Sequence, residues 1–149
     1  MESLINRWVR ALALGAVLVT VAAATATSGE DKPEVVAEKA SQSWLAVVDV
    51  GKYGESWDQA AQSFKKAVTH DKWIDALKQV RDPLGKVGSR KLKGTEYLEN
   101  PPNAPAGKYV IVQYDTDFEN KKATVETVSL TLESDGHWRV AGYFIKPGE

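Results

Sequence analysis

The sequence predicts an α+β domain in which three N-terminal helices pack on a four-stranded antiparallel sheet. Apolar residues recur at helical spacing from residue 33 to residue 81, and from residue 89 onward the period falls to two. Helices that are followed by a run of strands are typical of α+β folds with antiparallel sheets. The chain of 149 residues has room for one such domain behind a leader, and we expect the domain over residues 33–147.

The first 26 residues have the order of an export signal that is normally removed. Arg7 and Arg10 charge the start, an apolar run covers residues 11–24, and residues 24–26 (Ala-Thr-Ala) supply the small-x-small cleavage step. The apolar run is about 14 residues, short of the roughly 20 that a membrane-spanning helix needs, so an uncleaved anchor is the weaker alternative. We therefore expect an exported protein that is soluble after cleavage near Ala26.

Composition narrows the classes of partner. The 19 Lys and Arg residues are balanced by 20 Asp and Glu residues, so nucleic acid is not an expected partner. The sequence also has no basic amphipathic helix that would hold the cleaved chain on a membrane. Because there is no Cys, the core alone must hold the exported domain together. The aromatic residues expected in that core are Trp44, Trp57, Trp73 and Trp138.

Three helices are expected after a flexible tether at residues 27–32. The first begins at Pro33 and is ended by Gly51. The second covers residues 53–68, and the third follows Thr69 as its N-cap and ends near Arg81, before an Asp-Pro step. The residues predicted to face the core are Val36, Ala40, Trp44, Val47 and Val48 in the first helix, Trp57, Ala60, Ala61 and Phe64 in the second, and Trp73, Leu77 and Val80 in the third.

Four strands are expected, at residues 89–98, 109–118, 123–133 and 137–145. The first is the weakest, because its basic residues suit a solvated edge and Gly94 indicates a bulge. Between the first two strands, the Pro-rich segment 101–107 is expected to form an irregular loop that cannot pair in a sheet.

The last hairpin decides which side chains face the helices. A two-residue turn would mix polar and apolar residues on both faces of the sheet. A three-residue loop, Ser134 to Gly136 with Gly136 at positive φ, separates them and is the predicted turn. The predicted inner face then carries Val110, Val112, Tyr114, Thr116, Phe118, Val128, Leu130, Leu132, Trp138, Val140 and Phe144. The predicted outer face carries Thr127, Ser129, Thr131, Arg139 and Tyr143.

Several segments together resemble one family of exported bacterial proteins. They are Arg81-Asp82-Pro83-Leu84-Gly85, Ser89-Arg90-Lys91-Leu92, Gly107-Lys108-Tyr109-Val110 and the stretch from Asp135 to Phe144. Over about residues 37–145 the chain resembles the family catalogued as domain of unknown function 4019, in the nuclear-transport-factor-2-like superfamily. The resemblance implies a curved, cone-shaped sheet with helices in its concave side, often with a pocket inside, and a periplasmic location. It implies no activity, since superfamily relatives include isomerases, dehydratases and non-catalytic subunits.

Glu126 is the main candidate for chemistry, because the predicted register places it on the apolar inner face. In a largely apolar cavity its pKa would be raised and it could act as a general acid or base, with Tyr114 orienting a substrate oxygen. The structural alternative, which we favour, is that Glu126 pairs with Arg81 or Arg90, or lies in solvent at the sheet edge. The candidate catalytic residues are thus Glu126 and Tyr114, and the candidate ligand-binding residues are Tyr114, Thr116, Glu126, Phe144 and Arg81.

Two other patterns, the histidines and an acidic segment, give little support for a catalytic or a metal site. Neither His70 nor His137 is predicted to converge with a Ser or an acidic residue in a nucleophilic site. One acidic segment has the spacing of a calcium loop, but Asn120 stands where Gly is required and both flanks are predicted strands. The acidic residues of that segment are Asp115, Asp117, Glu119 and Glu126. We therefore expect no metal and no cofactor.

The expected function is that of a non-catalytic binding or assembly module, for a small apolar ligand in the cone or a protein partner at the sheet. The alternative is a small-molecule acid–base enzyme, isomerase-like or dehydratase-like, that uses a pocket carboxylate. The outer face is also more apolar than a solvated face requires, which suggests a homodimer through that face. Its apolar residues are predicted to be Tyr109, Ile111, Ala141, Tyr143 and Ile145.

Overall fold

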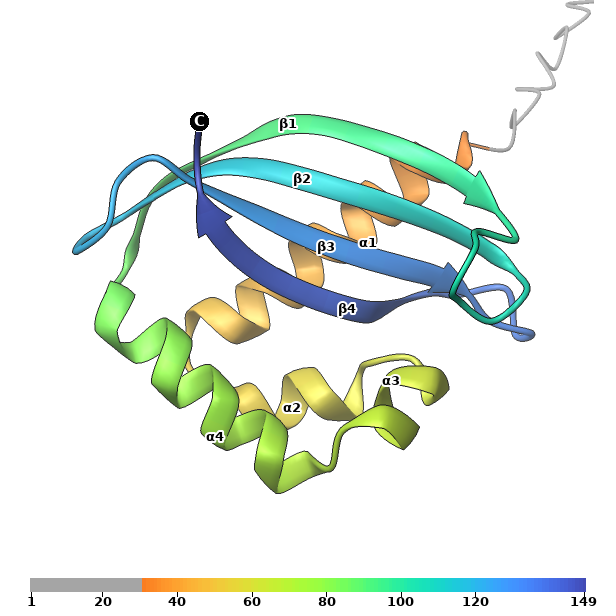
Figure 1. Ribbon diagram of the computed structural model, residues 1–149, viewed down its shortest axis with the longest axis horizontal. Helices are drawn as coiled ribbons and strands as arrows, with labels where there is room; N and C mark the ends of the chain where they lie inside the picture. The colour runs from red at the N-terminus through yellow and green to blue at the C-terminus, as the bar shows by residue number, and fades with distance from the viewer. Residues whose placement is uncertain (1–30) are drawn as a thin grey trace, which may run out of the picture.

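The computed structural model describes residues 31–149, and the expected export signal and most of the tether lie outside them. Four strands form one antiparallel sheet in the order β1-β2-β3-β4. The sheet is curved, and the helices lie on its concave side (Figure 1). The predicted α+β class with a single four-stranded antiparallel sheet is therefore confirmed. Within residues 31–149, no helix is long and apolar enough to cross a membrane.

Helix α1, Pro33–Asp49, begins with Pro33 in its first turn, as predicted. It ends in a Schellman motif: Gly51, at φ +77°, donates its N–H to the Val48 carbonyl (2.9 Å), and Lys52 donates to the Val47 carbonyl (3.2 Å). Gly51 thus ends the helix as expected. The buried face is turned slightly from the predicted one, so that Val36 is exposed. That face consists of Ala37, Ser41, Trp44, Leu45 and Val48.

The single helix expected over residues 53–68 is two short helices, α2 (Tyr53–Asp58) and α3 (Gln62–Ala67). Ala61, between them, has an extended backbone (φ −62°, ψ 152°) and donates its N–H to the carbonyl of Val140 in the sheet, at 2.8 Å. A continuous helix would have used that N–H internally. The break therefore exchanges a bond within a helix for one that fixes α3 to the sheet.

Helix α4, His70–Arg81, follows Thr69 and ends at Arg81, as predicted, where a 3₁₀ turn at Asp82–Leu84 takes over. The Thr69 side chain makes no capping hydrogen bond. Val80 was expected in the core but is 47% exposed. In the last turn of α4 the inward-facing residue is Arg81, which lies four residues after Leu77 and therefore on the same face of the helix.

The strands are β1 (Val87–Glu99), β2 (Lys108–Phe118), β3 (Thr124–Leu132) and β4 (Trp138–Pro147). Strand β1 is an edge strand, and its register shifts between Leu92 and Gly94, so both the edge and the bulge are confirmed. The last hairpin has the predicted three-residue loop, with Leu132 paired to Trp138 and Gly136 at φ +81°.

A bulge at Ala141 in β4 overturns part of the predicted register. Leu130 pairs with Val140, but Ser129 pairs with Gly142, so Ala141 has no partner. One extra residue moves every later side chain of the strand to the opposite face. The prediction that Phe144 faces inward and Tyr143 outward is therefore wrong: Tyr143 faces the helices, and Phe144 is 53% exposed.

Ser56 of α2 organises the aromatic part of the core. Its hydroxyl accepts a hydrogen bond from the Trp73 indole (2.9 Å) and donates one to the Tyr53 carbonyl (2.6 Å). Its own carbonyl accepts from the Trp44 indole at 2.9 Å. Ser56 is buried, so these polar groups have no access to water as a substitute partner.

We predict that Ser56→Ala lowers the free energy of unfolding by about 1–3 kcal/mol, because it leaves the buried Trp73 N–H without an acceptor. Urea denaturation measures the change. The matched control is Ser43→Ala on the exposed side of α1, where a change within about 0.5 kcal/mol is expected. Equal effects of the two substitutions would contradict the role given to Ser56.

Candidate functional site: a buried charge cluster and an outer-face pocket

Six side chains, one from each of six elements, meet on the inner side of the sheet. We call them the charge cluster: Asp49 (α1), Arg81 (α4), Arg90 (β1), Thr116 (β2), Glu126 (β3) and Tyr143 (β4). Asp49 and Arg81 are the last residues of their helices. The two arginines balance the two carboxylates, so the cluster as a whole is neutral.

Glu126 has no exposed surface, and both of its carboxylate oxygens are engaged. Oε1 accepts hydrogen bonds from Arg90 Nε (2.7 Å) and from the Thr116 hydroxyl (2.6 Å). Oε2 accepts a hydrogen bond from the Tyr143 hydroxyl. This is the structural alternative predicted for Glu126, with Arg90 as the partner. Neither oxygen of Glu126 is therefore in contact with a solvent-accessible space, which general acid–base chemistry on a bound molecule would require.

Asp49 joins the two arginines. Arg90 binds its carboxylate with two nitrogens, at 2.7 Å and 3.0 Å, and Arg81 Nη2 binds it at 2.9 Å. Without the arginines, a carboxylate at the C-terminal end of α1 would be repelled by the helix dipole. The planar guanidinium of Arg81 also lies over the Phe118 ring, 4.9 Å from its centroid.

The charges of the cluster shift the pKa values of its members. Burial raises the pKa of Asp49, but the hydrogen bonds and charges of Arg90 and Arg81 outweigh burial and hold that pKa below its ordinary value. Burial, and next the negative charge of Glu126, raise the pKa of Tyr143 well above its ordinary value. Asp49 is therefore ionised and Tyr143 protonated at neutral pH.

Tyr114 faces inward as predicted, but its hydroxyl is bonded elsewhere. Ser41 gives its only hydroxyl hydrogen to the Glu38 carbonyl (2.7 Å), so in the 2.6 Å contact between Ser41 and Tyr114 the tyrosine is the donor. The structure thus brings Glu126, Thr116 and Arg81 together in one cluster. It leaves Tyr114 beside helix α1, and it places Phe144 at the surface.

The acidic residues with calcium-loop spacing do not converge. Asp115 is exposed on the outer face and lies 3.6 Å from Lys93, whereas Glu126 is buried on the inner face. Within residues 31–149, no group of three or more His, Asp or Glu side chains is arranged to hold a metal ion.

We predict that Glu126→Gln lowers the free energy of unfolding by about 3–5 kcal/mol, the usual cost of breaking a buried ion pair, because the two arginines would share a single carboxylate. Urea denaturation measures it. Glu96→Gln on the exposed side of β1 is the control and should change stability little. A Glu126→Gln protein as stable as the parent would mean that the carboxylate is not a structural partner.

We further predict a change in alkaline stability for Tyr143→Phe. The pKa of Tyr143 is higher in the folded than in the unfolded chain, so its contribution is complete below the unfolded pKa of about 10 and is lost as the pH rises above that value. The free energy of unfolding of the parent should therefore fall more steeply above pH 10 than that of Tyr143→Phe, by up to about 1.4 kcal/mol per pH unit. Urea denaturation between about pH 8 and pH 11 measures both slopes, and equal slopes would contradict the assignment.

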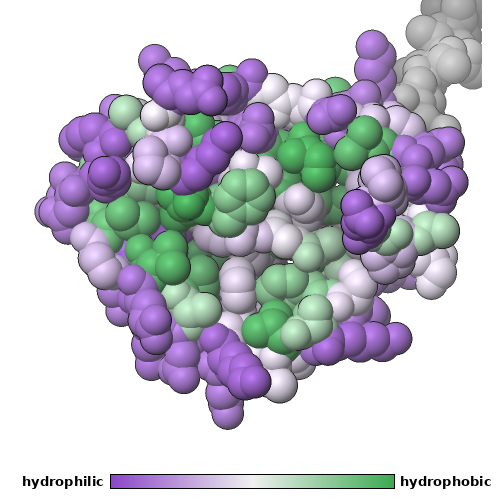
Figure 2. All heavy atoms as spheres, in the orientation of Figure 1, coloured by the Kyte–Doolittle hydropathy of each residue, from purple (hydrophilic) through white to green (hydrophobic). Residues whose placement is uncertain are grey.

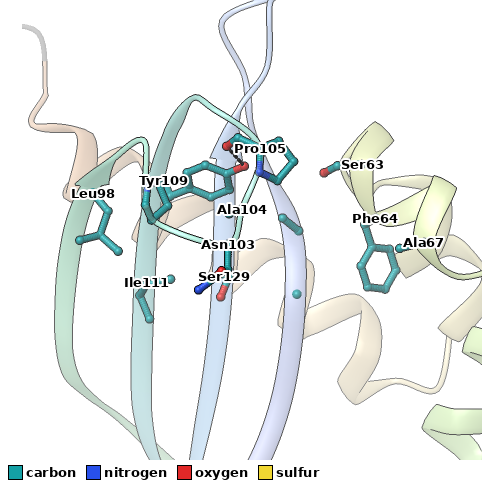
Figure 3. Close-up of a pocket in the computed structure, with 13 residues that line it drawn as sticks. Ser63, Phe64, Ala67, Leu98, Asn103, Ala104, Pro105, Tyr109, Ile111 and Ser129 are labelled. Atoms are coloured by element: carbon teal, nitrogen blue, oxygen red, sulfur yellow. Dashed lines mark hydrogen bonds between the residues drawn. The ribbon is translucent and has the colours of Figure 1, made fainter.

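A pocket of about 480 Å³ lies on the other side of the sheet, and sequence reasoning missed it. Its floor is the outer face of the central strands, and its walls are α3 and the loop between β1 and β2 (Figure 3). We call it the outer-face pocket. Its main side chains are Tyr109, Ile111 and Ser129 of the floor, Phe64 and Ala67 of α3, and Asn103 and Pro105 of the loop.

The loop wall is held in place before any ligand arrives. Asn100 donates its N–H to the Gly107 carbonyl, and Gly107 donates its own to the Asn100 side chain, both at 2.8 Å. The Tyr109 hydroxyl donates to the Pro105 carbonyl at 2.8 Å, as drawn in Figure 3. The sequence placed this Pro-rich segment correctly as an irregular loop. It gave no sign that the loop lies against the sheet.

The apolar outer face differs from the predicted one. Tyr109 and Ile111 face outward, as expected, and line the pocket. Tyr143 and Ile145 face the helices instead, because the bulge at Ala141 moves the later side chains of β4 to the opposite face of the sheet. In Figure 2, apolar and neutral residues gather over the middle of this side of the molecule and hydrophilic side chains surround them. The homodimer through this face stays a prediction, which sedimentation would test.

The model of one protein family, described as Protein of unknown function (DUF4019), matches residues 40–143 of the chain. The match covers helices α2 to α4, all of β1 to β3, and most of α1 and β4. None of the curated proteins matches the sequence.

Proposed function

Because the chain belongs to the DUF4019 family, whose members are described as proteins of unknown function, we propose its function from its own geometry. The protein is a non-catalytic binding module that takes a small apolar ligand in the outer-face pocket. The observation that carries this proposal is the pocket itself, about 480 Å³ in volume and walled largely by apolar side chains. Small-molecule sites are typically hollows of about 300–1,000 Å³ with such linings.

The interior of the domain favours this site over one in the cone. The inner face of the sheet is covered by buried side chains of the helices, among them Trp44, Leu45 and Leu77. The charge cluster occupies a further part of this face, and its carboxylates are bound to its guanidinium groups. The acid–base alternative would need Glu126 to meet a substrate, and its lack of exposure and its three hydrogen-bond donors argue for binding without catalysis.

We also propose a cone of the nuclear-transport-factor-2-like kind, and export to the periplasm. The curved sheet, with its helices on the concave side, supports the first proposal. The charged, apolar and small-residue order of residues 1–26 supports the second. In that location the ligand would reach the pocket from solvent, because the pocket opens on the surface of the domain.

The test uses the uncharged dye N-phenyl-1-naphthylamine, whose fluorescence rises in apolar sites. Ser129 lies in the pocket floor, so Ser129→Phe should fill the pocket and abolish the fluorescence increase, while Ser129→Ala should keep it. Both variants should unfold at temperatures close to that of the parent, because residue 129 faces outward.

Equal dye binding by the parent and Ser129→Phe would place the bound dye elsewhere and contradict the proposal. Absence of dye binding in the parent would contradict it as well.

A further inference from the structure

The outer-face pocket contains no charge. None of the 13 residues that line it is Asp, Glu, Lys, Arg or His, although such charged side chains other than His make up 26% of the chain. A nearby cation, Lys65 of α3, is directed away, over the Trp57 ring at 5.4 Å. A charged head group in the pocket would lose hydration without meeting an opposite charge, which is costly.

The pocket does contain polar groups that the protein leaves unpaired. Within residues 31–149, neither the side-chain amide of Asn103 nor the hydroxyl of Ser129 has a hydrogen-bond partner in the protein. Asn103 extends from the loop over the pocket, and Ser129 belongs to its floor (Figure 3). Both side chains can donate and accept hydrogen bonds. Around them lie the apolar side chains of Phe64, Ile111 and Leu98.

From these two observations, and resting on the proposed function, we infer that the ligand is an uncharged amphiphile with an aliphatic body and an amide-like head. The body covers the apolar side chains of the floor and α3. The head, which both donates and accepts, pairs with the Asn103 amide and the Ser129 hydroxyl. The fixed loop lowers the cost of binding, because the wall that carries Asn103 is already ordered.

The backbone conformation of Asn103 determines which substitution can test the role of its side chain. Its φ is +66°, a conformation that Asn and Gly tolerate better than other residues. Asn103→Gly therefore removes the amide and keeps the loop conformation, whereas Asn103→Ala would also strain it. Pro102→Ala is the matched control, since Pro102 is exposed in the same loop and does not line the pocket.

The experiment is an NMR titration of the folded protein with octanamide and with octanoate, which share a chain and differ in the charge of the head. Octanamide should bind about tenfold or more tightly than octanoate. Asn103→Gly should weaken octanamide binding about tenfold, the usual effect of losing one or two hydrogen bonds, while Pro102→Ala leaves it unchanged. Ser129→Phe should abolish binding of both compounds.

The results that would contradict the uncharged, amide-like ligand differ from those that would contradict the binding pocket itself. Octanoate binding as tightly as octanamide, with both lost in Ser129→Phe, would overturn the uncharged amide-like head and leave the apolar pocket supported. Unchanged octanamide binding by Asn103→Gly would overturn the role of Asn103 in the same way. If octanamide, octanoate and the fluorescent dye all fail to bind the parent, the proposed function and this inference both fall.

Discussion

Two arginines and two carboxylates share the interior of this domain, and moving any one of the four leaves the remaining three with an unbalanced charge. The charge cluster draws one residue from each of the four strands and from the ends of two helices. Apolar packing alone tolerates small shifts of one element against another, but a guanidinium that binds a carboxylate with two nitrogens does not. The cluster thereby fixes where α1 and α4 end relative to the sheet, and the remaining architecture follows from those positions.

The bulge at Ala141 connects the cluster to the opposite face of the sheet. Because the bulge moves the later side chains of β4 to the opposite face of the sheet, Tyr143 points inward to Glu126. The carbonyl of Val140, the residue before the bulge, accepts the Ala61 N–H and so holds the start of α3 against the strand. Helix α3 in turn supplies Phe64 to the wall of the outer-face pocket. One irregularity in one strand therefore helps to build both sites.

Side-chain periodicity was sufficient to predict what depends on local pattern: the α+β class, the four strands, the helix ends at Gly51 and Arg81, and the inward position of Glu126. It left open whether Glu126 pairs with Arg81 or Arg90 or lies in solvent, and Arg90 itself was assigned to a solvated edge. The break at Ala61 was not predictable, because it depends on a bond to a strand about 80 residues away along the chain. The bulge had a cue in Gly142, since Gly inside a strand pattern often marks one, and ignoring it misplaced Phe144 and Tyr143. The pocket had none, because a loop that folds back on a sheet has no periodic signature.

The loop from Asn100 to Gly107 joins two neighbouring strands and makes its hydrogen bonds almost entirely within itself and to Tyr109. It takes no part in the charge cluster or in the buried core. Substitutions in this loop can therefore remodel one wall of the pocket while leaving the folding of the domain intact. In a fold organised in this way, the core can be conserved while the loop changes. Descendants of one ancestral protein could therefore come to recognise different molecules by substituting a few loop residues.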